Sequence, residues 1–558
     1  MRIQELFNKA LQDTQSARFA AAEKKLRRIL REPLSDRHSA TVRELLGVVY
    51  ASQGDYKAAI KSLTEAAARN PADASIASNL SNCLREAGQI DEAVATGRKA
   101  VALNPELAAA QNNLGNALNA RGDLDGAVTA YRQALLIQPD FLEANNNLGL
   151  VLQAMGDLEG GIENYRRALR INPAFAEAHE NLGEALDEKG DLDLAEACYQ
   201  ELVDMHPDHA ALHNTLGIIL QEKHDMDGAV RHYEKALAIN PELLEARNNL
   251  GAVLYAKEDY AAAIDNCRKV LELNPAFAAA HENLGAIYST LGQYEDAIRS
   301  NDLADSLQSR AESLLCLYAL GRYDEFDRRV AGHLERDRLN IHIAAACAFV
   351  ASQTGRENLH PFCPRPLEFV NVGTIRDRVD DLDCFLDGIA SELTDISGVW
   401  EPLSRTTRHG FQTHGNLFRK GKPLLARLET IISAEIAAYR AKFGGCLLLE
   451  AWPEKTEMTG WSVRLHRNGH QSAHIHPTGW LSGVIYLELL EAPDPAEGAI
   501  EFGLDCPGYP VLNDASQCLC HHPKRGDIVL FPSSLYHYTI PIRQDGVRLT
   551  ISFDLMPV

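Results

Sequence analysis

No apolar run in this 558-residue sequence approaches the roughly 18 residues that a membrane-spanning helix needs. The first residues, MRIQELFNKALQD, include Glu5 and Asp13 and contain no apolar segment of the length found in secretory signal peptides. The 11 cysteines are mostly scattered singly, without the paired spacings of a disulfide framework or a zinc ribbon. These absences predict a cytoplasmic protein with reduced cysteines and no membrane partner.

One group of residues departs from that scatter, and it consists of Cys518, Cys520, His521 and His522. A structural zinc site takes four ligands, usually contributed as two pairs from separate segments. The side chains of this group alternate in direction as they would on a strand, and the group lacks a second pair of ligands. We therefore do not expect the group to bind zinc.

Positive charge is scarce, with 55 Lys and Arg against 77 Asp and Glu and a net charge of -22. We find no cluster of Lys and Arg of the kind that binds a phosphate backbone, and we expect no nucleic-acid partner. Most of the negative charge is attributed to the solvated faces of helices. The 46% apolar content is that of a folded protein, and the length requires more than one domain.

A regular repeat occupies the first half of the chain. Its template contains a Leu-Gly pair, a turn glycine and an alanine at the crossing of two short helices, and a proline ends the second helix. The prolines stand 34 residues apart, at Pro71, Pro105, Pro139, Pro173, Pro207, Pro241 and Pro275. His224 and Glu258 replace the turn glycine in two units, where we expect some strain.

This pattern resembles the tetratricopeptide repeat family over about residues 40–309, with degenerate terminal repeats at 1–39 and 310–345. The resemblance implies an all-α solenoid over 1–345 that binds a protein or peptide in its groove. The oligomeric state stays open, because such solenoids can also pair through an outer face.

An asparagine recurs at one position of the repeat, and Thr215 interrupts the series. Its members are Asn79, Asn113, Asn147, Asn181, Asn249 and Asn283. An asparagine amide both donates and accepts, so a row of them suits an extended peptide backbone, although each could instead bond within its own repeat. The row is similar to the one with which the O-GlcNAc transferases hold protein substrates, which implies a peptide-binding role here.

The repeat pattern ends before a proline-containing stretch, and we expect a linker over 346–375 and a second domain over 376–558. Helical patterns at 379–393 and 422–442 are followed by short apolar segments typical of strands. These segments are CLLLEAW, WSVRLHR, SGVIYLEL, AIEFGL, DIVLFP and VRLTISFDL. The pattern predicts a mainly-β antiparallel sandwich or jelly roll with flanking helices.

Three histidines are the candidate metal ligands of this domain. His474 and His476 flank one residue, so on a strand their side chains leave on the same side, and His537 follows the strand DIVLFP. Two near ligands and one distant ligand fit a facial metal site that leaves coordination positions open.

The motifs LHRNGHQSAHIHP, SGVIYLEL, GAIEFG, KRGDIVLFPSSLYH and VRLTISFDL resemble the iron(II) and 2-oxoglutarate-dependent oxygenases of the prolyl hydroxylase type, closest to a bacterial and phage branch. The resemblance implies a double-stranded β-helix, iron(II) as metal, and 2-oxoglutarate and O2 as co-substrates. It implies that Arg548 pairs with the far carboxylate of 2-oxoglutarate. Tyr486 matches the family position whose hydroxyl also binds this carboxylate, although Tyr486 could instead be a core tyrosine. His466 matches a family position that lines the pocket.

His476 departs from this family, because most members have Asp or Glu at that position. Three neutral imidazoles leave iron(II) with more positive charge, which puts metal choice and activity in doubt. The leading hypothesis is an oxygenase that hydroxylates a protein or peptide recruited by the solenoid. The alternatives are a small-molecule oxygenase whose repeats bind a partner, and a non-catalytic scaffold with a repurposed jelly roll.

Overall fold

The structure is a computed structural model that describes residues 2–394, 396, 398–401, 406–413, 415–490, 494, 496–504, 506, 508–513 and 518–558. The chain forms two compact units, Met1–Ala185 and Leu186–Val558, which we describe separately. Among the described residues, no helix combines the length and the apolar content that crossing a membrane requires.

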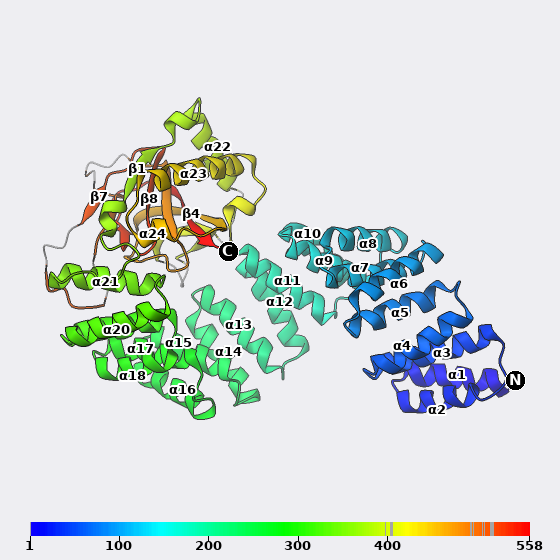
Figure 1. Ribbon diagram of the computed structural model, residues 1–558. Coiled ribbons are helices and arrows are strands. Elements are labelled where there is room, and N and C mark those ends of the chain that lie inside the picture. The colour runs from blue at the N-terminus through cyan, green and yellow to red at the C-terminus, as the bar shows by residue number, and fades with distance from the viewer. Residues whose placement is uncertain are drawn as a thin grey trace. The chain divides into compact units, whose positions relative to one another are not determined.

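The first unit consists of antiparallel helix pairs, as the repeat predicts (Figure 1). Its helices are α1 (Arg2–Gln15), α2 (Phe19–Ile29), α3 (Asp36–Ser52), α4 (Tyr56–Arg69), α5 (Ala74–Glu86), α6 (Ile90–Leu103), α7 (Ala108–Ala120), α8 (Leu124–Ile137), α9 (Leu142–Ala154), α10 (Leu158–Ile171) and α11 (Ala176–Lys189), which runs across the boundary of the two units.

The small residue of the Leu-Gly pair has the packing role that its size suggests. A Cβ on Gly115 would lie 2.6 Å from the ring of Tyr131, and one on Gly149 would lie 2.6 Å from Tyr165. Each glycine therefore makes room for a tyrosine of the second helix of its pair. The turn glycines adopt the expected left-handed conformation, with φ between 70° and 87°, at Gly54, Gly88, Gly122, Gly156, Gly190 and Gly292.

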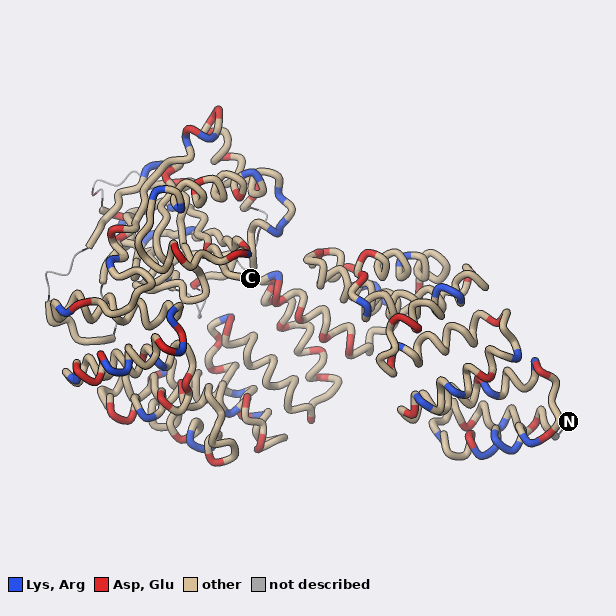
Figure 2. Tube along the Cα trace, in the orientation of Figure 1, with Lys and Arg blue, Asp and Glu red and all other residues tan. Residues whose placement is uncertain are grey.

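The second unit continues the helical pairs and then adds two β-sheets. Its repeat helices are α12 (Leu192–Met205), α13 (Ala210–Glu222), α14 (Met226–Ile239), α15 (Leu244–Ala256), α16 (Tyr260–Leu273), α17 (Ala278–Thr290), α18 (Tyr294–Ala304), α19 (Leu307–Ala319), α20 (Tyr323–Arg336) and α21 (Ile341–Thr354). His224 and Glu258 take the left-handed turn conformation without glycine, both at φ 63°. Acidic and basic residues are interspersed along these helices (Figure 2).

The sheets confirm the predicted antiparallel jelly roll. The larger has the strand order β1-β8-β5-β10-β4-β3-β2 and the smaller the order β7-β6-β9. The strands are β1 (Asn371–Thr374), β2 (Gly398–Trp400), β3 (Thr407–Thr413), β4 (Thr456–Gln471), β5 (Leu481–Glu488), β6 (Ile500–Phe502), β7 (Leu519–His521), β8 (Asp527–Pro532), β9 (His537–Thr539) and β10 (Arg548–Pro557).

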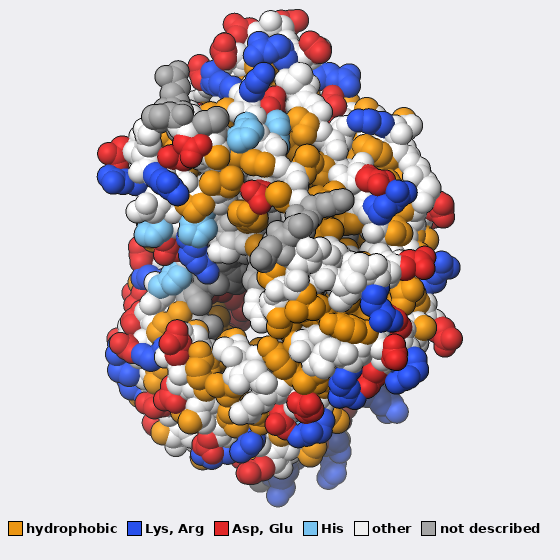
Figure 3. Space-filling view, turned by 90° about the vertical axis from the view of Figure 1, so that its left-hand side faces the viewer, with side chains coloured by type: hydrophobic (Ala, Val, Ile, Leu, Met, Phe, Trp, Pro, Cys, Tyr) orange, Lys and Arg blue, Asp and Glu red, His pale blue; other side chains and the backbone are white. Residues whose placement is uncertain are grey.

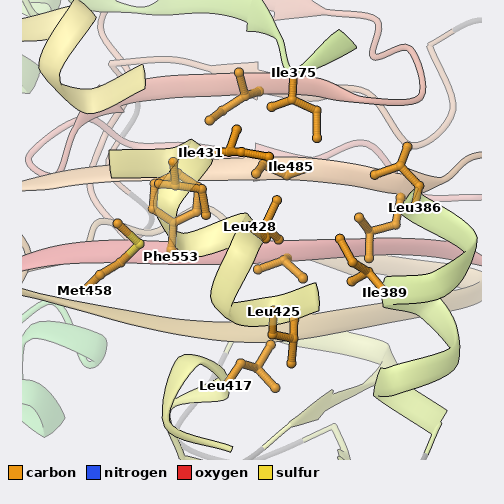
Figure 4. Packing of buried hydrophobic residues seen from close by; sticks show 14 of the residues in the cluster. Ile375, Leu386, Ile389, Leu417, Leu425, Leu428, Ile431, Met458, Ile485 and Phe553 are labelled. Carbon is orange, nitrogen blue, oxygen red and sulfur yellow. The ribbon is translucent and has the colours of Figure 1, made fainter. Parts of the chain in front are cut away.

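Two helices, α22 (Leu382–Thr394) and α23 (Pro423–Lys442), cover one face of the large sheet at the positions expected from the sequence. Leu425, Leu428 and Ile431 of α23 lie against Ile485 of β5 and Phe553 of β10 (Figure 4). Burial of these side chains is the main stabilising contribution of this layer, because the effect grows with the apolar area removed from water.

The final strand β10 has two different faces, and both are buried. Its apolar face, which lies under the helices, consists of Leu549, Ile551, Phe553 and Leu555. The alternate residues, which share the side of Val484 and Tyr486 and therefore face the smaller sheet, are Arg548, Thr550, Ser552 and Asp554. Since alternate residues of a strand point to opposite faces, polar side chains line the space between the two sheets.

One predicted strand is wrong. The segment CLLLEAW contains a short helix, α24 (Leu447–Glu450), and no strand. Its first amides bond across to the preceding segment, Leu447 N–H to the Pro361 carbonyl and Leu448 N–H to the Phe362 carbonyl. A short apolar run fits a buried strand and a buried helical turn equally well, and these distant partners decide between them. Strands β1, β2, β3, β7 and β9 were not predicted.

The last repeats pack on the jelly roll within the second unit. Cys506, Tyr509 and Tyr536 join the core of α17–α21, and Ile341 of α21 packs in a cluster with Trp480. Helix α21 itself continues to Thr354, into the stretch expected as a linker. These shared cores explain why one compact unit contains both kinds of structure. The division into 1–345, 346–375 and 376–558 stays a prediction from sequence pattern.

Candidate metal centre

The fold brings the three candidate histidines together at one end of the small sheet. His537 begins β9, and His474 forms an isolated antiparallel bridge with it, each amide donating to the other's carbonyl at 3.1 Å. His476 lies two residues further on, where its amide donates to the Ser533 carbonyl. One ring nitrogen from each histidine lies within 4.8 Å of those from the other two. Other histidine side chains lie at the surface, and several are visible in pale blue on one face of the molecule (Figure 3).

Hydrogen bonds fix the orientation of all three rings. The Nδ1 atom of His474 lies 2.7 Å from the Ser472 carbonyl, and that of His537 lies 3.1 Å from the Leu535 carbonyl. The Nδ1 of His476 lies 2.6 Å from a carboxylate oxygen of Asp554. Because each of these partners accepts, each Nδ1 carries the proton, and each Nε2 presents a lone pair.

The Nε2 lone pairs of His474 and His476 face each other, and a ring nitrogen of His537 lies within 4.8 Å of a ring nitrogen of each. The Nε2 atoms of His474 and His476 are only 3.1 Å apart, and on this proton assignment neither has a hydrogen to share. The Thr406 hydroxyl, 3.4 Å from His474 Nε2, is one donor beside them. Facing lone pairs repel, and a cation between them removes that repulsion. This donor set suits iron, zinc, copper or nickel.

Burial favours the neutral, metal-binding form of His474 and His537. Loss of water and the neighbouring His476 lower the pKa of His474 to about 3. Burial lowers the pKa of His537 well below its ordinary value, and its two histidine neighbours add to the effect. The imidazoles of His474 and His537 are therefore ready to coordinate without first losing a proton.

Asp554 is a member of the site that sequence reasoning missed. Its Oδ1 accepts from His476 Nδ1 and from the Ser482 hydroxyl, both at 2.6 Å, and the residue is 7% exposed. The alternation of polar and apolar residues in VRLTISFDL was the available signal. That pattern is usually read as a strand with one face in solvent, whereas here the polar face is inside.

A buried cation, Arg548, lies on the same polar face, and no acidic side chain among the described residues forms an ion pair with it. Arg548 is 2% exposed, and its Nε and Nη1 have no hydrogen-bond partner in the part of the chain that the structure describes. Its guanidinium lies over the ring of Tyr486 at 5.1 Å, and burial lowers its pKa. An uncompensated buried charge is costly, so this fork fits an anionic group of carboxylate shape.

Tyr486 shares that environment. It is fully buried, and its hydroxyl likewise has no hydrogen-bond partner among the described residues. Burial raises its pKa to about 12, so the hydroxyl keeps its proton and can donate. Tyr486 and Thr550 are paired across β5 and β10, which places this hydroxyl beside the polar face of β10.

The structure places His466 away from this centre. On β4, Trp461 has its ring 5.5 Å from that of His476, and His466 is an odd number of residues further along, which directs it to the other face. Its ring lies 6.0 Å from Trp400 and 5.9 Å from Phe411. Those aromatic side chains, and not the three histidines, are its neighbours.

The asparagine column forms bonds that neither reading of the sequence anticipated. Each amide nitrogen donates to the preceding repeat, as from Asn113 to the Ser78 hydroxyl (2.9 Å), Asn181 to Asn146 (2.9 Å) and Asn283 to Asn248 (2.9 Å). Asn79, Asn147 and Asn249 bond in the same way. The column therefore links neighbouring repeats through its amide nitrogens.

The group at Cys518–His522 does not form a metal cluster within the described residues. His521 Nε2 lies 3.1 Å from Asp527 Oδ2, and Cys520 Sγ lies 3.9 Å from His522 Nε2. The described part of the chain contains one cluster of three ligands able to hold a metal, and it is the histidine cluster.

Family models match the repeat region and the jelly-roll region separately. A family model described as "Putative 2OG-Fe(II) oxygenase" matches residues 459–554. Models described as "TPR repeat" or "Tetratricopeptide repeat" match residues 115–156, 14–74, 46–107, 146–210, 208–276 and 266–299. A solved structure described as YrrB, a TPR protein with an unusual peptide-binding site, is 25% identical over 36% of this chain and 99% of its own, with a TM-score of 0.30. A comparison with curated proteins found no match.

The oxygenase match includes the three clustered histidines, Asp554 and Arg548. The chain therefore belongs to the tetratricopeptide-repeat proteins and carries, at residues 459–554, a domain of the family described as "Putative 2OG-Fe(II) oxygenase".

Proposed function

We propose that this protein is an iron(II)- and 2-oxoglutarate-dependent oxygenase that hydroxylates a protein or peptide. The close approach of the Nε2 lone pairs of His474 and His476, with a ring nitrogen of His537 within 4.8 Å, carries the proposal, because that arrangement is unfavourable without a cation. His474, His476 and His537 would hold the iron. They occupy one side of it and leave positions open for a co-substrate and oxygen.

Arg548 and Tyr486 would bind the far carboxylate of 2-oxoglutarate. The guanidinium offers Nε–H and an Nη1–H, two donors in a fixed fork that matches a carboxylate, and the tyrosine hydroxyl adds a third. Iron(II) and 2-oxoglutarate together supply the oxidising power, in which the keto acid is decarboxylated to succinate, O2 is consumed and a hydroxyl group is placed on the substrate. The chain contributes ligand orientation and a site from which water is largely excluded.

The repeats would recruit the substrate. The asparagine column presents side-chain carbonyl oxygens at regular 34-residue intervals, and these can accept from the N–H groups of an extended peptide irrespective of its side chains. The interruption at Thr215, whose hydroxyl donates within its own helix to Ala211, divides the column into two stretches.

The test of the centre is an anaerobic titration of the purified protein with iron(II) and then 2-oxoglutarate. We expect a weak visible charge-transfer band from the chelated keto acid. His537→Ala should abolish metal binding. Arg548→Ala should still bind the metal but should bind 2-oxoglutarate about 10-fold or more weakly, as expected for loss of a charged hydrogen-bonding partner. Absence of a band at millimolar 2-oxoglutarate in the parent protein would exclude the proposed co-substrate.

The recruitment step is tested by incubating the loaded enzyme with a pool of synthetic peptides and measuring mass gain of one oxygen atom. Asn113→Ala combined with Asn147→Ala should reduce hydroxylation of captured peptides while leaving the charge-transfer band unchanged. Thr215→Ala serves as the matched control at the same repeat position. Equal turnover in all three proteins would indicate a substrate that does not use the column.

A further inference from the structure

The metal-binding triad contains a histidine where a carboxylate would neutralise part of the metal's charge. A site with two histidines and one carboxylate has an anionic ligand, whereas His474, His476 and His537 are all neutral ligands. The structure places the nearest carboxylate of the site directly behind His476, at 2.6 Å from its Nδ1. Neither of the other two histidines has an acidic partner at Nδ1, because both donate to backbone carbonyls.

The surroundings of Asp554 are built to hold one carboxylate orientation. Oδ1 accepts from the Ser482 hydroxyl, which is itself 2.8 Å from the Ser533 hydroxyl. A Cβ on Gly479 would lie 3.1 Å from Asp554 Cγ and 2.8 Å from Ser533 Oγ, so only glycine fits against this group. The backbone is tied at the same place, since the His476 amide donates to the Ser533 carbonyl.

We propose that Asp554 is a positioning residue that supplies the negative charge of the metal centre through His476. The Asp554–His476 pair then does jointly what a carboxylate ligand does alone: it orients the donor atom, makes it more basic and offsets the metal's charge. This inference rests on the proposed metal site. It accounts for how a triad of three histidines can hold a divalent metal without a carboxylate ligand.

The first measurement is a titration with cobalt(II), whose visible absorption reports its ligands, for the full-length chain and its variants. Asp554→Asn should weaken cobalt(II) binding by about 10- to 100-fold, the usual effect of removing such a partner, and shift the absorption band. Asp554→Glu should recover part of the affinity. Ser482→Ala keeps the carboxylate but removes one hydrogen bond that orients it, so its loss of affinity should be smaller than that of Asp554→Asn.

A double-mutant cycle separates charge from packing. In a His476→Asp background the carboxylate binds the metal directly, so adding Asp554→Asn should change the affinity by less than about threefold or improve it. The same 10- to 100-fold loss in both backgrounds would show that Asp554 acts through the fold and would overturn the proposal. So would a Ser482→Ala loss equal to that of Asp554→Asn.

A matched control is available elsewhere on the same sheet. Asp527 forms a half-buried pair with His521, at 3.1 Å, outside the histidine cluster. Asp527→Asn should leave cobalt(II) affinity unchanged, and urea unfolding of the metal-free proteins should show whether either variant damages the fold. If the parent protein binds no metal, the proposed function fails together with this inference. If the parent and Asp554→Asn bind equally well, only this inference fails.

Discussion

The buried glycine of each repeat illustrates how a single residue sets the geometry of the solenoid. Gly217 of α13 lies where a Cβ would be 2.6 Å from the ring of Tyr233, which is fully buried in α14. The tyrosine is also held from its other end, because its hydroxyl donates to Gln221 at 3.0 Å. Neither ring nor backbone can move without disturbing the helix pair.

Gly217→Ala is therefore expected to destabilise the protein by about 1–3 kcal/mol, through overpacking against Tyr233. Gly332→Ala is the matched control, since Gly332 is an exposed helical glycine of α20 with no atom within 4 Å of the added Cβ. That substitution should be neutral or stabilising by up to about 1 kcal/mol, because alanine has the higher helix propensity. Urea denaturation of both variants measures the difference, and equal effects would contradict the packing argument.

The spacing of the histidines in the chain predicted that they form one cluster, whereas Arg548 was singled out by the resemblance to the oxygenases. Neither signal pointed to Asp554, which is 78 residues from His476. An aspartate in an apolar strand can bond to a ligand, a turn or solvent, and the choice depends on which strand lies beside it. His466 illustrates the converse, since a suggestive position in the sequence lies on the other face of β4.

At the scale of elements, the asparagine column connects the first helices of successive repeats. Asn147 on α9 donates to Asn112 at 3.2 Å and to Asn116 at 3.0 Å, both on α7. Asn112 is 6% exposed, so its side-chain oxygen has little access to water as a substitute. These bonds tie each helix pair to the preceding one, which is the interface on which solenoid stability depends.

Asn147→Ala should cost about 1–3 kcal/mol of unfolding free energy, because it leaves a buried acceptor unsatisfied. Thr215→Ala changes the same repeat position but removes only a bond within its own helix, to Ala211. We expect that control to stay within about 0.5 kcal/mol of the parent protein. Urea unfolding followed by circular dichroism provides both values, and a Thr215→Ala cost as large as that of Asn147→Ala would argue against the inter-repeat role.

The whole molecule is divided by packing in a way that the repeat pattern does not reveal. Tyr509, in the loop after β6, donates to the Glu312 carboxylate of α19 at 2.6 Å, and burial raises the pKa of that carboxyl. The Tyr318 hydroxyl donates to the Pro510 carbonyl at 2.5 Å. The last repeats thus form one buried surface with the jelly roll, whereas Met1–Ala185 is a compact unit of its own.

Two deletions distinguish this division from the one based on sequence pattern. Deletion of residues 1–175, which keeps α11 whole as a terminal cap, should leave a monomeric protein that unfolds cooperatively and binds metal. Deletion of residues 1–345 cuts α21 and exposes the apolar surface around Phe362 and Trp480, so we expect aggregation. Gel filtration with metal titration checks both, and a soluble, metal-binding 346–558 fragment would refute the shared-core argument.

The sequence by itself determined the features that depend on neighbours in the chain. The 34-residue period, the left-handed turn glycines, the helix pairs and the alternation of β10 follow from local sterics and side-chain periodicity. The alternation of side chains along an extended segment likewise predicted that His474 and His476 lie on the same side.

Only the tertiary structure decided what depends on partners far apart in sequence. Two layers cover β10, helices on its apolar face and the small sheet on its polar face, and this puts Arg548 and Asp554 inside the molecule. Glu312 and Tyr509 meet across 197 residues, and α24 forms where Pro361 and Phe362 accept its amides. A polar residue in a strand does not specify which surface will cover it, and that covering surface determines whether it meets solvent or a metal-binding histidine.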